Sequence, residues 1–270
     1  MEDIIEVKSI VKKFGIFTAV DSISFKVKKG EIFGFLGPNG AGKTTTIRVL
    51  ATLTRPTSGT AIIDSFDILK NPHEVRSRIG LVAEKIILYD RLTADENLRF
   101  FGRLNNLPKE IIKERSAQWL KRLNMEAWRD KQVGVYSSGM KQRINVARAL
   151  LTEPDILFLD EPTLGLDPQT SNLIRTFITE LKEKGITILL TTHDMHEAEV
   201  LSDRVAIIDK GKIAAIDSTN NLKKVVKGAP NPTLEDVFLT LTGKEVRDFA
   251  EKQIPTTRGH WRRPPTKRVR

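Results

Sequence analysis

The chain has 270 residues, of which 40% are hydrophobic and 29% charged, and its formal net charge at pH 7 is +10. These values predict a globular protein with a sizeable core, and no apolar run approaches the roughly 20 residues that span a bilayer. The chain has no cysteine, which excludes disulfides, thiolate metal sites and cysteine nucleophiles. Because the N-terminus lacks the basic-then-apolar pattern of a signal peptide, we expect a cytoplasmic protein.

The positive charge is concentrated at the C-terminus. Residues 251–270 hold seven Lys or Arg and one Glu, so this segment carries six of the ten net charges. Its composition, rich in Pro, Arg and Thr without periodicity, is typical of a disordered tail. Such a tail can contact anionic lipid or RNA, but a solvated end is the commoner case. We expect a folded domain over residues 1–245 and a basic tail over 246–270.

Three strands are predicted before residue 37. Alternating apolar residues over 4–10 and 22–27 indicate strands with one exposed face, and the apolar run over 31–36 indicates a buried strand. Phe14 lies between the first two strands, beside Gly15. It is either a core residue or a platform on which the flat ring of a ligand stacks.

A glycine-rich loop with the spacing G-x-x-x-x-G-K-[ST] joins the buried strand to a helical pattern over 45–51. Backbone N–H groups at a helix N-terminus form an anion site, Lys43 adds a charge for β- and γ-phosphates, and the Thr44 hydroxyl is a ligand for Mg²⁺. A glycine turn that only caps a helix is the alternative, which the flanking strand and helix disfavour. The predicted nucleotide contacts are Gly37, Pro38, Asn39, Gly40, Ala41, Gly42, Lys43, Thr44 and Thr45.

The middle of the chain changes from alternating strands and helices to helices alone. Strands are predicted over 60–64 and 79–83, with a short helix over 72–77, and apolar residues at helical spacing follow over 97–128. Because this block interrupts the alternation, we expect an α-helical subdomain over about 94–152 that stands off the sheet. Its Trp and Phe side chains are expected in the core.

Polar side chains follow two later strands. The predicted strand over 155–160 ends in Asp160 and Glu161, and a strand over 187–192 is followed by His193. Buried carboxylates are costly without a task. In a phosphate-loop protein Asp160 would hold Mg²⁺, and Glu161 would polarise a water for attack on the γ-phosphate. A lone His is more often a capping or surface residue, but at the ends of parallel strands His193 is a candidate γ-phosphate sensor.

A second phosphate-binding surface is predicted before a helix over 144–151. Small residues, Ser137, Ser138 and Gly139, precede this helix and carry no Lys of their own. One γ-phosphate has little use for two such surfaces on one chain. The simplest interpretation is that Ser137 and Gly139 contact ATP held by another subunit, in a head-to-tail dimer.

In this order and spacing, the motifs closely resemble those of the ATP-binding subunits of ABC transporters, over about residues 4–245. The resemblance implies an α/β fold with a RecA-like parallel-sheet core, an N-terminal antiparallel β subdomain and an α-helical subdomain. The matching motifs are Walker A (37–44), the signature (136–140), Walker B (156–160) and the D-loop (165–167). Glu161 resembles the family's general base, His193 its switch histidine, and Phe14 its adenine-stacking aromatic.

Two motifs depart from the commonest family pattern. Residues 136–140 read YSSGM in place of LSGGQ, and Glu84 replaces the usual Gln, although a carboxylate can still reach Mg²⁺. With the segment 232–243, they resemble the daunorubicin-resistance and sodium-efflux exporter branch. That branch implies a separate membrane permease of about six helices, whose coupling helix would contact residues 87–98, with Tyr89 and Leu92 as apolar candidates.

We therefore predict the ATPase subunit of an ABC exporter, peripheral on the inner face of the cell membrane. It binds ATP and Mg²⁺ and pairs with a second ATPase subunit, expected to be a copy of itself. Catalysis is assigned to Glu161, His193 and Lys43, and Mg²⁺ binding to Thr44, Asp160 and Glu84.

The alternative is a soluble ABC-type ATPase that acts on nucleic acid or ribosomes through the basic tail. Such relatives usually carry two ATPase domains or a long inserted coiled coil, and the interval 44–156 has room for neither. Nucleic acid is therefore not expected as a partner, and the transported cargo is left open.

Overall fold

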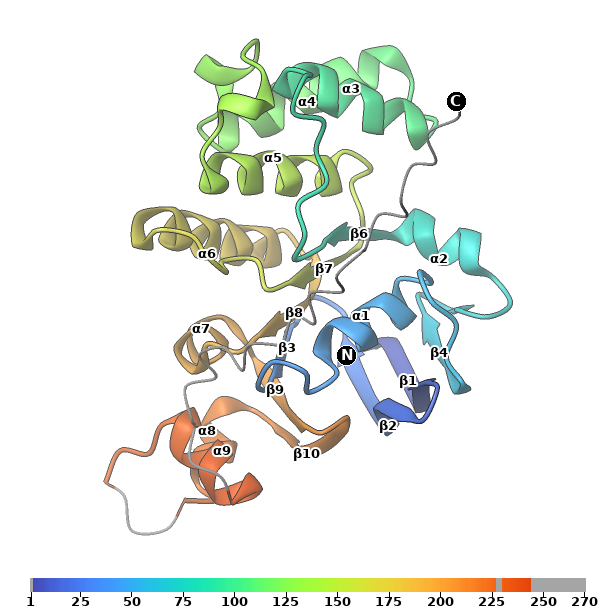
Figure 1. Ribbon diagram of the computed structural model, residues 1–270, viewed down its shortest axis with the longest axis vertical. Helices are drawn as coiled ribbons and strands as arrows, with labels where there is room; N and C mark the ends of the chain where they lie inside the picture. Colours follow the sequence, from blue (N-terminus) through green and yellow to red (C-terminus); the bar gives the residue numbers. More distant parts are fainter. Residues whose placement is uncertain (1, 227–229, 244–270) are drawn as a thin grey trace, which may run out of the picture.

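A six-stranded sheet forms the centre of the computed structural model, which describes residues 2–226 and 230–243 (Figure 1). Five strands run parallel and the edge strand β10 is antiparallel, in the order β10-β9-β3-β8-β7-β6. Every residue of the central strands β3, β7 and β8 is buried, as expected where both faces of a parallel sheet are covered. The strands are β3 (Ile32–Leu36), β6 (Ile79–Val82), β7 (Ile156–Asp160), β8 (Thr187–Thr192), β9 (Arg204–Asp209) and β10 (Lys212–Asp217).

A second, antiparallel sheet has the order β2-β1-β4-β5 and packs on the central one. Phe25 of β2 stacks on Phe33 of β3 with ring centroids 5.3 Å apart. The first strand is longer than predicted, since it reaches Phe14, which pairs with Phe17 across the turn at Gly15. Phe14 therefore ends this strand, whereas the sequence placed it between the two predicted strands. The strands are β1 (Asp3–Phe14), β2 (Phe17–Lys28), β4 (Ser58–Ile63) and β5 (Phe66–Asp67).

Different elements cover the two faces of the central sheet. On one face α1 (Lys43–Leu50) and the antiparallel sheet pack against alternate strand residues such as Phe158 and Leu189. On the other face α5 (Ser138–Leu150) and α6 (Pro168–Glu183) pack against Leu157 and Leu190. Smaller helices complete the layers, namely α2 (Pro72–Arg78), α7 (Met195–Leu201), α8 (Thr219–Lys223) and α9 (Leu234–Thr242).

The helices α3 (Ala94–Leu104) and α4 (Lys109–Arg122) lie together at the end of the molecule opposite α8 and α9 (Figure 1). They approach closely at Gly102, where an added Cβ would lie 2.7 Å from Ile112 Cγ1. Trp119 is buried as predicted, but Phe100 and Trp128 are 41% and 42% exposed. The expectation that the aromatic residues of this block all lie in the core was therefore wrong for these two.

Two of the predictions made from the sequence involve residues that the structure does not describe. The basic tail over 246–270 lies outside the described residues, and the boundaries of the ATPase domain remain a prediction. Within residues 2–226 and 230–243, no helix combines the length and hydropathy needed to cross a membrane.

Candidate active site

The glycine-rich loop between β3 and α1 needs glycine at two close backbone contacts. A Cβ on Gly37 would lie 2.2 Å from the Ile208 carbonyl oxygen, and one on Gly42, whose φ is 107°, would lie 2.5 Å from the Ala19 carbonyl oxygen. Lys43 is 5% exposed and turns back into the loop. Its Nζ donates to the carbonyl oxygens of Gly37, at 2.7 Å, and of Pro38, at 3.3 Å. The loop is thus a tight backbone cradle that surrounds one ammonium group.

A hollow of about 340 Å³ opens in front of this cradle, which we call the phosphate hollow. The structure brings the predicted residues Glu84 and Glu161 to it, from the ends of β6 and β7. Its lining residues are Phe17, Ala19, Asn39, Gly40, Ala41, Gly42, Lys43, Thr44, Thr45, Glu84, Glu161 and Leu164. The predicted loop residues 39–45 thus line one hollow together with two of the predicted carboxylates, whereas Gly37 and Pro38 contact the Lys43 ammonium through their carbonyl oxygens.

The aromatic side chain in the lining of the phosphate hollow is Phe17, not the predicted Phe14. Phe14 is 54% exposed, and the ammonium of Lys12 lies 4.9 Å from the centre of its ring. The role of Phe14 in stacking on adenine stays a prediction. Sequence reasoning missed Phe17, although its place directly across the hairpin turn from Phe14 was a signal for it.

Asp160 ends β7 beside the loop and is 2% exposed. Its Oδ1 accepts hydrogen bonds from Thr44 Oγ1, at 3.0 Å, and from Thr191 Oγ1, at 2.7 Å. Burial raises the pKa of Asp160, although the two hydroxyl donors oppose this. Thr191, which sequence reasoning missed, also accepts from the Glu161 backbone N–H, so it fixes both carboxylate-bearing residues.

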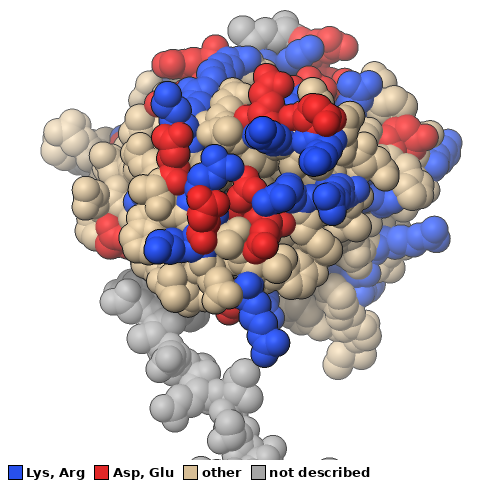
Figure 2. All heavy atoms as spheres, turned by 90° about the horizontal axis from the view of Figure 1, so that it is seen from above, with Lys and Arg blue, Asp and Glu red and all other residues tan. Residues whose placement is uncertain are grey.

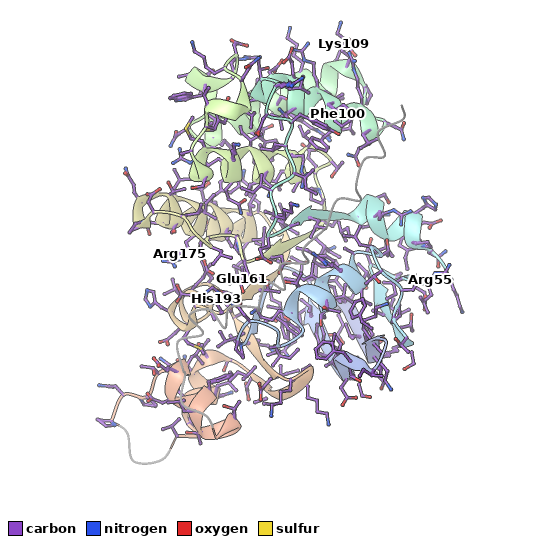
Figure 3. All side chains as sticks on the ribbon, viewed as in Figure 1. Arg55, Phe100, Lys109, Glu161, Arg175 and His193 are labelled. Carbon is purple, nitrogen blue, oxygen red and sulfur yellow. The ribbon has the colours of Figure 1, made fainter. Side chains whose placement is uncertain are left out.

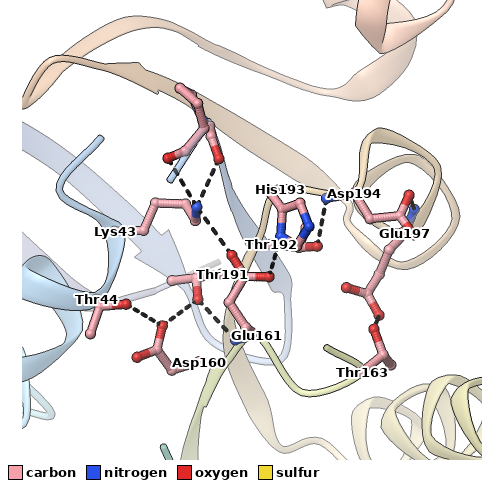
Figure 4. Close-up of polar contacts among 12 residues, drawn as sticks. Lys43, Thr44, Asp160, Glu161, Thr163, Thr191, Thr192, His193, Asp194 and Glu197 are labelled. Atoms are coloured by element: carbon pink, nitrogen blue, oxygen red, sulfur yellow. Dashed lines mark hydrogen bonds and ion pairs between the residues drawn. The ribbon is translucent and has the colours of Figure 1, made fainter. Parts of the chain in front are cut away.

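The carboxylate of Glu161 lies between the side chains of Lys43 and His193 (Figure 4). Its Oε1 lies 3.1 Å from Lys43 Nζ, and its Oε2 lies 2.8 Å from His193 Nδ1. Burial alone would raise the pKa of Glu161, but the hydrogen bond with His193 and the charge of Lys43 outweigh it and lower this pKa. The same hydrogen bond raises the pKa of His193, against an opposing effect of burial. The three side chains therefore form one charged group at the strand ends.

The signature residues lie apart from this group. Ser137 caps α5, its Oγ accepting from the Met140 backbone N–H at 3.2 Å, so the helix begins earlier than the predicted residue 144. Ser137 and Ser138 are exposed, whereas Gly139 is buried against Thr170 of α6. None of them lines the phosphate hollow in the described part of the chain. The structure therefore brings together the loop, Asp160, Glu161 and His193, and leaves Ser137 and Ser138 facing outward.

Comparison with known proteins agrees with this geometry. The ABC transporter family model matches residues 20–164. The doxorubicin resistance ATP-binding protein DrrA of Mycobacterium tuberculosis is 44% identical over 235 residues, which cover 87% of this chain and 69% of that protein. A solved ATP-binding subunit of an ABC transporter superposes with a TM-score of 0.79 at 29% identity, over 88% of this chain and 99% of its own.

A dimeric ATP-binding cassette in a post-hydrolysis state, bound to ADP and Pi, gives a TM-score of 0.72 at 28% identity, over 79% of this chain and 98% of its own. The chain belongs to the ABC transporter family. It is an ATP-binding and ATP-hydrolysing subunit, and its relatives agree with the predicted exporter branch. The predicted fold class, with its parallel core, antiparallel sheet and helical region, is confirmed. ATPases of this family act as dimers with membrane permease subunits.

Proposed function

We propose that this chain powers export across the cell membrane by hydrolysing ATP at sites shared between two copies of itself. The observation that carries the proposal is the division of the predicted ATP-binding residues. Lys43, Glu161 and His193 form one group at the strand ends, while Ser137 and Ser138 are exposed on another element. A head-to-tail dimer would bring the exposed serines of one copy to the phosphate hollow of the other.

In the proposed reaction, Lys43 and the loop amides bind the phosphates, and Glu161 accepts a hydrogen bond from the attacking water. Its lowered pKa keeps this carboxylate ionised at neutral pH, as a base must be. A γ-phosphate would compete with Glu161 for Lys43 and His193, because Lys43 Nζ and His193 Nδ1 both lie within 3.1 Å of the carboxylate. Binding of ATP would thus release the carboxylate toward water at the moment when it is needed.

The oxygen atoms around the loop fit Mg²⁺. The Thr44 hydroxyl donates to the Asp160 carboxylate at 3.0 Å, and Thr44 and Glu84 both line the phosphate hollow. Among the described residues no group of three His, Cys, Asp or Glu side chains could enclose a metal alone. This suits Mg²⁺, which keeps water and substrate phosphates as ligands and is held by few protein groups. When bound, it would neutralise charge on the β- and γ-phosphates.

A permease of about six helices would bind beside Glu84. A second hollow of about 510 Å³ there is lined by Glu84 and Asp160 together with the exposed side chains Leu53 and Ile87. Nearby, the exposed Tyr89 packs edge to face on Phe100, with ring centroids 4.9 Å apart. Apolar side chains beside a magnesium-ligand candidate suit a coupling helix whose movement must reach the nucleotide. Docking there would place the chain on the inner face of the membrane.

The cargo we propose is a drug-like molecule, supported by the name of the doxorubicin resistance relative. The nucleic-acid alternative relies on the basic tail, which lies outside the described residues, and the described surface over α3 and α4 adds no support for it. Figure 2 shows Lys and Arg interleaved with Asp and Glu on this face, where a phosphate backbone would require a patch of one sign.

The decisive test is the variant Glu161→Gln. ATP binding should persist, turnover should fall by about 10²- to 10⁴-fold, and ATP should trap a dimer that gel filtration detects. The wild-type chain with ADP is the control and should elute as a monomer. Turnover of Glu161→Gln at the wild-type rate would remove the assignment of the base. A permease that co-purifies with the tagged chain from detergent-solubilised membranes would establish the partner.

A further inference from the structure

Glu197, on α7, is a buried carboxylate outside the phosphate hollow. It lies four residues after His193 and is 1% exposed. Thr163 Oγ1 donates to its Oε1 at 2.7 Å (Figure 4), and Arg175 Nε lies 3.5 Å from the same oxygen. Because an enclosed carboxylate is costly unless it is paired, the segments that supply these two partners are tied to α7.

Both partners lie on the segment that carries the proposed base. Thr163 follows Glu161 by two residues, in the loop that leads to α6, and Arg175 lies on α6 itself. Arg175 Nη2 also contacts Asp194 Oδ2 at 3.2 Å, and Asp194 directly follows His193. We call these four residues, Thr163, Arg175, Asp194 and Glu197, the clasp.

Thr163, Asp194 and Glu197 lie beside the Glu161–His193 pair (Figure 4), and Arg175 is labelled in the same region of the molecule in Figure 3. Asp194 caps α7, since its Oδ1 accepts from the backbone N–H groups of His196 and Glu197. The orientation of the segment after His193 is therefore coupled to Arg175, and through Glu197 to Thr163. In the part of the chain that the structure describes, no polar contact of the clasp reaches Lys43 or Thr44, which lie on the separate β3–α1 connection.

The clasp also adjoins residues 165–167, which match the D-loop of the family. Thr163 precedes residues 165–167, and Asp167 caps α6 by accepting from the Thr170 backbone N–H at 2.9 Å. A second subunit that presses on residues 165–167 would therefore push on a loop that is fixed to the segment after His193. A role in folding alone would instead make Glu197 a buried anchor whose loss lowers stability and leaves the folded enzyme unchanged.

We propose that Glu197 is a positioning residue. Through Thr163 and Arg175, it holds Glu161 and His193 in the orientation that the reaction requires. This inference rests on the catalytic roles proposed above. Since the phosphate cradle is built on other elements, weakening the clasp should lower kcat and leave the KM for ATP unchanged. A misplacement of about 1 Å at a reacting group can cost about 10²-fold in rate.

The test uses Thr163→Val, which removes the hydroxyl at nearly constant shape, and Thr163→Ser, which retains it. We expect Thr163→Val to lower kcat by about 10- to 100-fold with a KM for ATP within about twofold of wild type, and Thr163→Ser to restore kcat. Glu197→Gln should give an intermediate loss. The matched control is Glu199→Gln on the same helix, because Glu199 pairs instead with Lys223, away from the site.

Thermal unfolding is measured for each variant. A wild-type kcat in Thr163→Val, or a loss that tracks a lowered melting temperature and is not rescued by Thr163→Ser, would overturn the role of the clasp. Glu161→Gln is assayed in parallel to separate the two proposals. If Glu161→Gln is inactive while Thr163→Val is normal, only the clasp fails; if Glu161→Gln is active, the assignment of the base fails.

Discussion

The two surfaces expected to contact ATP differ in how the fold builds them. Lys43 and Glu161 are 5% and 7% exposed and are held by strand ends and a backbone cradle. Ser137 and Ser138 are exposed at the N-terminus of α5. The hydroxyl of Ser137 caps this helix by accepting a hydrogen bond from the Met140 backbone N–H. The first surface is assembled within one chain, whereas the second offers donors without any other half of a site.

This difference explains how association can control the reaction. A buried, pre-arranged group can bind phosphate alone, but exposed amides at a helix terminus contribute only when a ligand or partner excludes water from them. Under the proposed function, the residues around Lys43 and Glu161 are arranged within one chain, and a second subunit supplies the remaining contacts to ATP. Substitutions around Lys43 should therefore weaken ATP binding, whereas substitutions at Ser137 should block hydrolysis in the dimer.

The largest effect is expected at the cradle. Lys43→Ala removes the ammonium that donates to the loop and that is proposed to bind the phosphates, so ATP affinity should fall by about 10²-fold or more, given the strength of charge-assisted hydrogen bonds. Equilibrium binding of a fluorescent ATP analogue measures this. Lys85→Ala, which removes an exposed charge beside the second hollow, is the control and should bind normally. Normal affinity in Lys43→Ala would show that the loop is not the phosphate site.

The second prediction tests whether each ATP site is shared between two chains. Ser137→Arg should block the signature surface and leave each cradle intact, so that neither this variant nor Lys43→Ala hydrolyses ATP alone. An equal mixture of the two should recover about a quarter of wild-type activity, because half of the dimers are mixed and each has one intact site. Recovery is read as phosphate release. If the mixture stays inactive while both variants dimerise, each site belongs to a single chain.

Much of the cradle could be predicted from the sequence, because its signals are local. The glycine spacing, the apolar runs of β3 and β7 and the polar residues at their ends lie within short segments whose periodicity specifies the fold. The signature helix was placed too late because a Ser–Gly start carries no apolar period. The strands β9 and β10 and the helices from α6 onward were not predicted.

Contacts between distant segments could not be predicted in this way. Thr191 reaches Asp160 across two neighbouring strands, and Glu197 reaches Thr163 from 34 residues further along the chain. Gln142 of α5 donates to the Pro162 carbonyl oxygen at 2.8 Å, which joins the signature helix to the segment after Glu161. Each of these pairs depends on how helices and strands pack, and a Thr, Glu or Gln alone gives no sign of its partner.

A third prediction concerns the charged pair inside the site. The pKa of His193 is raised, so its contribution to the free energy of unfolding is complete below its ordinary pKa of 6.5 and is lost as pH rises through the raised value. The pKa of Glu161 is lowered, so its contribution is complete above its ordinary pKa of 4.5 and is lost as pH falls through the lowered value.

Chemical denaturation of wild type and His193→Gln should therefore show the largest stability difference between about pH 4.5 and 6.5, and a smaller one at pH 9. Ser137→Ala is the comparison variant, and its stability difference from wild type should not vary with pH in this range. A His193→Gln difference that is independent of pH would mean that the Glu161–His193 contact is not an ion pair in solution.

The smallest effect is expected at Glu84, where the family's usual residue is Gln. Glu84→Gln removes one negative charge from the lining of the phosphate hollow, so ATP should bind more tightly, by about two- to fivefold at low salt for a partly screened charge. Because salt weakens an interaction of this kind, the gain should shrink as ionic strength rises. Titrations at two salt concentrations, with Glu96→Gln on α3 as the matched control, measure it. A tenfold loss of Mg²⁺-dependent binding would instead identify Glu84 as a magnesium ligand that the amide cannot replace. Mg²⁺ binding would then need the carboxylate of Glu84, at the end of β6, as much as that of Asp160.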